Sequence, residues 1–211
     1  FGTSSFALST LEKLSQSEFQ PALVVTTPDA AWGRKKVLTP SPVKKKAVEL
    51  GLEVFQPASL KAPEAVKAIK AVEPMVGVLA AYGKIVPKAI IDLFPKGILN
   101  VHPSILPRWR GPTPLQSTIL AGDDKTGVAI ILIDEEVDHG PVLANRELQI
   151  ANGETYQSLH DKLAKLGADL ILETLPKWLA GKITPLPQDH SQATFCKKFT
   201  REDARIDWLK P

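Results

Sequence analysis

Two polar residues at the end of an apolar run, Asn100 and His102, give the clearest chemical signal in this sequence. Side chains alternate between the two faces of a strand, so these two point the same way while Val101 points into the opposite layer. An amide donor beside an imidazole donor can hold a developing oxyanion if both are fixed in advance. Pro103 and Pro107 restrict the backbone just downstream, which favours a rigid loop. We therefore predict an oxyanion-stabilising pair here; a histidine satisfied at the edge of the core is the alternative.

A carboxylate that can complete this pair is Asp138, which follows the apolar run GVAIILI and precedes Gly140 and Pro141. A turn at that point would lean back toward His102, where an acid can orient the imidazole and carry protons. Ser104 offers a competing Ser-His-Asp hydrolase. It lies in no G-x-S-x-G elbow, so the hydrolase interpretation is disfavoured.

Other kinds of chemistry lack their usual motifs. The sequence contains no G-x-G-x-x-G and no Walker-type glycine loop to cradle the phosphates of a nucleotide. The four histidines have no zinc-ligand spacing, and Cys196 is the single cysteine. The run DEEVD, residues 134–138, is a conceivable magnesium site, yet consecutive acids on a turn are more often solvated. We therefore predict a site without a bound metal.

The order of the expected elements indicates an α/β fold. Apolar, β-branched runs of strand length occupy residues 22–27, 52–55, 75–82, 97–102, 127–133 and 142–150. Helical spacing occupies residues 6–14, 42–50, 62–71 and 153–180. This alternation predicts a Rossmann-like, mostly parallel sheet with helices on both faces, in which ligands bind beyond the carboxyl ends of the strands. The opening GTSSFA is typical of the loop after a first strand, so we expect one more strand ahead of Phe1.

Composition sets outer limits on function. The chain has 211 residues, 44% of them hydrophobic, which is enough for a sizeable core. No run approaches the roughly 18 apolar residues of a membrane-spanning helix, and a single cysteine suits a reducing compartment. The net charge of +3 is mild, but six positive charges and no negative one lie between residues 34 and 46. This basic run is either a solvated loop or a patch that contacts phosphates.

Three segments carry a resemblance to a known family: NVHPSILPRWRGPTP, the later DHGPVL and the earlier AAYGKIVPK. Together they resemble the formyltransferases that use 10-formyltetrahydrofolate, and within that family the branch that acts on methionyl-tRNA. The resemblance spans nearly the whole chain and includes the RIDW segment near its end. It implies that residues 1–180 form a formyltransferase catalytic domain and residues 181–211 a linker toward a C-terminal tRNA-binding domain outside this sequence.

The resemblance also implies roles for individual residues. The family's catalytic residues correspond to Asn100, His102 and Asp138. Its folate-contacting residues correspond to Ser104, Ile105, Leu106 and Pro107. Its basic acceptor-binding loop corresponds to Arg34, Lys35 and Lys36, in a segment that departs from the usual pattern.

The activity implied is transfer of the formyl group of 10-formyltetrahydrofolate to the amino group of initiator methionyl-tRNA, for translation initiation. The resemblance implies a monomer without a metal, in the bacterial cytoplasm or an organellar matrix. Three alternatives stay open: a sugar-nucleotide N-formyltransferase, a formyl-folate hydrolase, and a non-catalytic tRNA-binding module.

Overall fold

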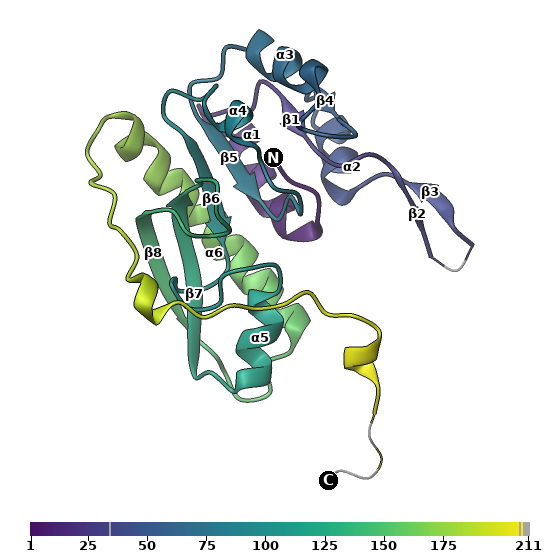
Figure 1. Cartoon of the computed structure of the whole chain (residues 1–211), viewed down its shortest axis with the longest axis vertical. Coiled ribbons are helices and arrows are strands. Elements are labelled where there is room, and N and C mark those ends of the chain that lie inside the picture. Colours follow the sequence, from purple (N-terminus) through teal and green to yellow (C-terminus); the bar gives the residue numbers. More distant parts are fainter. Residues whose placement is uncertain (34, 207, 209–211) are drawn as a thin grey trace.

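The computed structural model describes residues 1–33, 35–206 and 208, and its centre is a mixed, four-stranded sheet (Figure 1). β5 (Gly77–Ala80) and β6 (Ile98–His102) are parallel neighbours. β7 (Lys125–Leu132) pairs antiparallel with β6, and β8 (Val142–Gln149) pairs antiparallel with β7. The α/β fold that the sequence predicts is confirmed. Within this sheet β7 runs against both of its neighbours, which the apolar pattern did not indicate.

A shorter pair of strands extends the sheet beyond β5. β1 (Val24–Val25) and β4 (Val54–Phe55) are parallel. Phe1 and Gly2 lie between β1 and β5. Gly2 N donates to the carbonyl of Val25 over 3.0 Å, and the Phe1 carbonyl accepts from the last residue of β5 over 2.9 Å. The first two residues of the chain therefore connect the two parts of the sheet.

Helices cover both faces of the sheet (Figure 1). One face carries α1 (Leu8–Ser15), α2 (Pro42–Glu49), α5 (Pro114–Ala121) and α6 (Tyr156–Leu179). The other carries α3 (Pro63–Ala71) and α4 (Lys88–Ile91). Within the described residues, no helix is both long and apolar enough to cross a membrane.

β6 shows the alternation that the sequence predicts. Leu99 and Val101 belong to the apolar core under α6, whereas Ile98 belongs to the core under α3 and α4. α6 comes close to β6 because Gly167 has no Cβ: one added there would lie 2.6 Å from Val101 Cγ1. Asn100 and His102 therefore face away from α6.

Several described elements lie outside those that the sequence predicts, among them α4, α5 and the hairpin of β2 (Ala30–Trp32) and β3 (Val37–Thr39). The strands of the hairpin have three residues each and β3 is largely exposed, so no apolar alternation marks them. α5 has Pro114 in its first turn and a left-handed Gly122 just past its end, the usual signals of a short helix.

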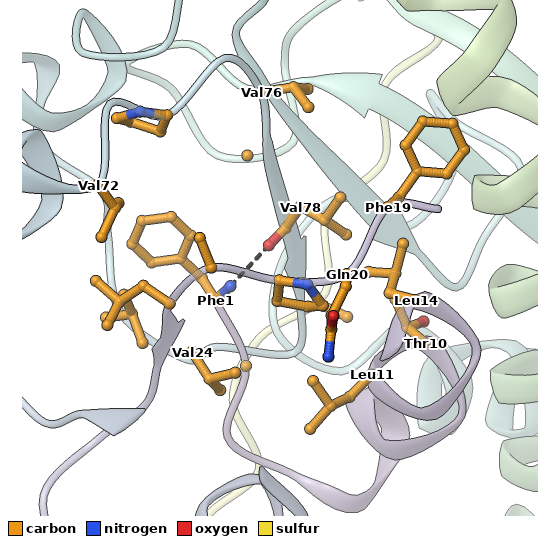
Figure 2. A pocket seen from close by; sticks show the side chains of 18 of the residues that line it. Phe1, Thr10, Leu11, Leu14, Phe19, Gln20, Val24, Val72, Val76 and Val78 are labelled. Atoms are coloured by element: carbon orange, nitrogen blue, oxygen red, sulfur yellow. Dashed lines mark hydrogen bonds between the residues drawn. The ribbon is translucent and has the colours of Figure 1, made fainter. Parts of the chain in front are cut away.

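An apolar cavity of about 320 Å³ lies beside the first residues of the chain (Figure 2). Its walls come from α1 and from the segments that precede β1 and β5, and they include Leu11, Phe19 and Val76. Phe1 N donates to the Val78 carbonyl over 2.7 Å. None of the predicted catalytic residues lines this cavity, so it is separate from the candidate site.

Candidate active site

The structure places Asn100 and His102 on the same face of β6, as their spacing predicts. Both are buried, with 7% and 4% of their surface exposed. Across the antiparallel ladder they lie opposite Ile131 and Ala129, which belong to a small apolar cluster. The two polar groups therefore rest on an apolar floor near the carboxyl end of β6, where water screens hydrogen bonds little.

The carboxylate of Asp138 reaches this pair from the loop of residues 133–141, which joins β7 to β8. Asn100 Nδ2 donates to Oδ1 over 3.0 Å, and Gly111 N donates to Oδ2 over 2.8 Å. His102 Nδ1 lies 3.4 Å from Oδ1. The φ of Asp138 is +49°, a left-handed conformation that a non-glycine residue keeps only where its surroundings hold it. The structure thus brings the three predicted side chains together.

The imidazole of His102 has an oxygen facing each of its nitrogens. Nε2 lies 2.9 Å from the Trp109 carbonyl, and Nδ1 faces Asp138. A ring with hydrogens on both nitrogens donates to both oxygens, whereas a neutral ring can donate to only one of them. Each ring nitrogen therefore has an acceptor of its own, which fixes the orientation of the ring. A donor held in a fixed orientation is what stabilisation of an oxyanion requires.

The loop that leaves β6 contains the residues predicted to contact folate: Ser104, Ile105, Leu106 and Pro107. Ser104 Oγ donates to the Arg108 carbonyl over 2.6 Å, and Leu106 packs into the apolar cluster under the site. Ile105 packs against Gly127, where any Cβ would collide with its Cδ1. Ser104 and Leu106 are buried, so their side chains stabilise the loop. Their contact with folate stays a prediction.

Asp123 anchors the same loop on its outer side. Arg108 Nε and Nη2 donate to the two Asp123 oxygens over 3.0 and 2.6 Å, and Trp109 Nε1 donates over 2.8 Å. The Arg108 guanidinium also lies 4.4 Å from the centre of the Trp109 ring. The hydrogen bond from Arg108 holds the pKa of Asp123 below its usual range. These contacts fix the backbone of Trp109, whose carbonyl faces His102.

A segment near the end of the described chain, residues 186–197, also lies against this loop, and we refer to it as the strap (yellow in Figure 1). Phe195 forms a parallel bridge with Arg110, and Cys196 N donates to the Arg110 carbonyl over 2.8 Å. The sequence predicts a linker over residues 181–211, and its proline-rich composition signals none of these contacts. The strap therefore contributes residues to the surroundings of the site that sequence reasoning missed.

Two of the predicted acceptor-binding residues, Lys35 and Lys36, lie at the turn of the β2–β3 hairpin, which projects from the sheet (Figure 1). Lys35 and Lys36 are exposed there, and Arg34 lies outside the described residues. Farther along the basic run, the ammonium groups of Lys44 and Lys46 pair with carboxylates at 2.8 and 3.0 Å. Part of the charge on α2 is thus neutralised, and the hairpin lysines are the better placed to meet a phosphate.

The acidic run after β7 has contacts of its own. Asp134 lies 2.7 Å from His139 Nδ1, and the His139 ring stacks on His190 of the strap with ring centres 4.1 Å apart. Across the described ranges, no group of three or more His, Cys, Asp or Glu side chains could hold a metal ion. This acidic run is therefore linked to the strap through two stacked imidazoles.

Comparison with known proteins identifies the class to which this sheet and site belong. A family model described as "Formyl transferase" matches residues 1–175, and the chain belongs to that family, as its motifs predict. The methionyl-tRNA formyltransferase of Methylococcus capsulatus is 46% identical over 209 residues, covering 99% of this chain and 68% of that protein. The methionyl-tRNA formyltransferase of Listeria monocytogenes is 42% identical over 210 residues, covering 100% of this chain and 67% of that protein.

Solved structures share the fold at lower identity. Glycinamide ribonucleotide transformylase 1 from Symbiobacterium toebii superposes with a TM-score of 0.72 at 17% identity, over 88% of this chain and 91% of that one. An N-formyltransferase from Helicobacter canadensis, in complex with folinic acid and dTDP-3-aminofucose, gives 0.70 at 19% identity, over 96% and 70%. These likenesses extend the shared architecture to enzymes with quite different acceptors.

Proposed function

We propose that this protein transfers the formyl group of 10-formyltetrahydrofolate to the free amino group of methionyl-initiator-tRNA, in the cytoplasm, for translation initiation. Relatives named methionyl-tRNA formyltransferase, 42–46% identical along the whole chain, support this acceptor. The observation that carries the chemistry is the contact of Asp138 with both Asn100 and His102, at 3.0 and 3.4 Å. One amide, one imidazole and one carboxylate at a single point are the groups that acyl transfer to an amine needs.

We propose one step for each group. The acceptor amine attacks the formyl carbon, so a carbon–nitrogen bond forms while the carbonyl oxygen gains negative charge. The Asn100 amide has a second hydrogen besides the one that contacts Asp138, and it would donate to this oxygen together with His102. The bond to N10 of the folate then breaks. Asp138 holds the imidazole and passes the proton of the amine, through water, to the departing N10.

His102 must change one contact for this step. Its Nε2 lies 2.9 Å from the Trp109 carbonyl, and Nδ1 faces Asp138. The formyl oxygen would therefore replace the Trp109 carbonyl at Nε2 or share that hydrogen with it. Because Trp109 is held by its own side-chain contacts, we propose that its carbonyl keeps the imidazole correctly oriented until the substrate binds.

Acceptor binding would use the exposed hairpin. Lys35 and Lys36 would contact the phosphates of the tRNA together with Arg34, which lies outside the described residues. Contacts with phosphates release counterions, so the KM for tRNA should rise steeply with salt. A double variant, Lys35→Ala with Lys36→Ala, should weaken that dependence and leave the KM for the folate unchanged.

The test is direct. The protein is incubated with 10-formyltetrahydrofolate and methionyl-tRNA, and formylmethionine is measured by mass spectrometry after deacylation. A parallel reaction offers a dTDP-linked amino sugar as the acceptor. Formylation of the tRNA supports the proposal, whereas preferential formylation of the sugar would assign the other acceptor class. Absence of both products, together with no thermal shift on adding 5-formyltetrahydrofolate, would indicate a non-catalytic module.

Single-turnover rates then test the site. Asn100→Ala should slow transfer by roughly a hundredfold to a thousandfold, because one oxyanion donor is lost. Asn145→Ala is a matched control, since Asn145 is an exposed asparagine on β8 of the same sheet. If Asn100→Ala transferred as fast as Asn145→Ala, the role proposed for this amide would be wrong.

A further inference from the structure

Gln188 holds the backbone of the loop that carries Asp138, and we infer that it is a positioning residue for the proposed formyl transfer, on which this inference rests. Gln188 lies in the strap, 50 positions after Asp138 in the sequence. It is buried, with 7% of its surface exposed, although the segments around it are polar. Its role follows from the hydrogen-bond partners of its side-chain amide.

The Gln188 amide is fully engaged at both ends. Its Nε2 donates to the Asp138 carbonyl over 2.9 Å and to the Gly140 carbonyl over 2.7 Å. Its Oε1 accepts from Arg110 Nε and Nη2 over 3.0 and 2.7 Å. Two hydrogens and two lone pairs are all that an amide offers, so these contacts fix its orientation. Gln188 therefore bridges Arg110 to the loop of Asp138.

Asp138 is consequently held through its backbone as well as through its side chain. Its side chain accepts from Gly111 N, and its backbone carbonyl accepts from Gln188. Both restraints depend on two adjacent residues. Gly111 donates to Asp138 directly, and Arg110, which precedes it, holds Gln188. The left-handed φ of Asp138, +49°, needs such restraint, since it lies in a region that non-glycine residues rarely occupy. Release of the backbone contact would let the carboxylate rotate away from the imidazole.

Because Arg110 contacts the side chain at position 188, a carboxylate there would keep one contact of the amide and lose the others. Arg110 is 3% exposed and, among the described residues, its guanidinium has no carboxylate within 4.0 Å. In Gln188→Glu the new carboxylate would pair with Arg110 and keep the strap attached. It would bring no hydrogen to the carbonyls of Asp138 and Gly140, and it would face them with negative charge instead. This substitution therefore separates attachment of the strap from positioning of the loop.

The experiment compares Gln188→Glu with Gln192→Glu in the full 211-residue chain. Gln192 is the matched control because it is an exposed glutamine of the strap whose side chain, among the described residues, donates a hydrogen bond only to Ser191. We expect Gln188→Glu to lower kcat by about tenfold to a hundredfold, since small misplacement of a catalytic group has effects of that size. The KM for either substrate should stay within about twofold, because ground-state binding is untouched. Gln192→Glu should match the parent protein in both constants.

A second readout does not depend on activity. The imidazole nitrogens of His102, identified in NMR spectra by their loss in His102→Asn, should shift in Gln188→Glu and not in Gln192→Glu. An inactive parent protein whose His102 signal still shifts would overturn the proposed function and support the positioning role. An active parent protein with unchanged kcat and an unchanged His102 signal in Gln188→Glu would overturn the positioning role. A lower Tm with normal kcat would do the same, because it would make Gln188 a purely structural residue.

Discussion

Replacing Gly111 with alanine tests whether the loop after β6, the strap and Asp138 hold one another in position. Gly111 has a φ of +113°, which glycine adopts readily and other residues do not. A Cβ at this position would lie 2.6 Å from the carbonyl oxygen of Cys196 in the strap. The Gly111 N–H also donates to Asp138 Oδ2 over 2.8 Å. One methyl group therefore perturbs the backbone, the strap and the carboxylate together.

The structure allows the size of the effect to be worked out. Backbone strain of this kind costs about 1–3 kcal/mol, and overpacking against a fixed carbonyl costs about 1–3 kcal/mol more. We expect Gly111→Ala to lower the free energy of unfolding by about 2–6 kcal/mol. Gly122→Ala is the matched control: Gly122 has a φ of +66°, and no atom lies within 4 Å of its Cβ position. It should cost only the left-handed strain, about 1–2 kcal/mol.

Two assays decide the matter. Urea unfolding followed by tryptophan fluorescence gives the two free energies, and single-turnover formyl transfer, measured where both variants are folded, gives the chemistry. Transfer in Gly111→Ala should slow by at least about tenfold, because the donor that holds Asp138 is displaced. Transfer in Gly122→Ala should be unchanged. Equal losses of stability in the two variants, with an unchanged rate in Gly111→Ala, would refute the proposed linkage.

Three further outcomes concern stability and are measured by urea unfolding. Leu106→Ala should lower the free energy of unfolding by about 2–5 kcal/mol because it opens a cavity under the loop, whereas Leu120→Ala, at an exposed site, should change it by less than about 0.5 kcal/mol. Asp123→Asn should destabilise the protein at neutral pH. The pKa of Asp123 is lowered by its hydrogen bond from Arg108, so the deficit should shrink as the pH falls below about 4, where the parent protein loses the same charge. In a polypeptide that begins at Phe1, the amine has a pKa lowered from 8.0 to about 5. Between pH 5 and pH 8 the unfolded chain then binds more protons than the folded protein. The free energy of unfolding should therefore rise with pH across this range, by up to about 4 kcal/mol. A flat profile there would contradict the burial of this amine.

The sequence predicts the positions of Asn100 and His102 well because they depend only on the local geometry of one strand. Asn100 and His102 share a face because side chains alternate along any strand, whichever strands lie beside it. Asp138 is a different case, since its position depends on contacts with Asn100 and Gly111, which lie 38 and 27 positions away. The sequence indicates a turn near Gly140 that would bring Asp138 back toward His102, and the family resemblance gives this acid the same role.

Other features have no sequence signal of their own. The direction of β7 is one, because a strand buried on both faces shows the same apolar run whether it is parallel or antiparallel to its neighbours. The bridge between Arg110 and Gln188 is another. It joins residues 78 positions apart through a side-chain amide, and no motif or periodicity marks such a pair in advance.

The strap is synthesised late, after the rest of the residues around the proposed site. It follows α6 in the chain, so every strand of the sheet leaves the ribosome before residues 186–197 do. Closing a loop of 78 residues between Arg110 and Gln188 is entropically costly until the sheet holds its ends near one another. A nascent chain can therefore assemble its sheet and helices first. The backbone around Asp138 is restrained only when the strap docks, so synthesis of the sheet is complete before the polypeptide becomes competent for catalysis.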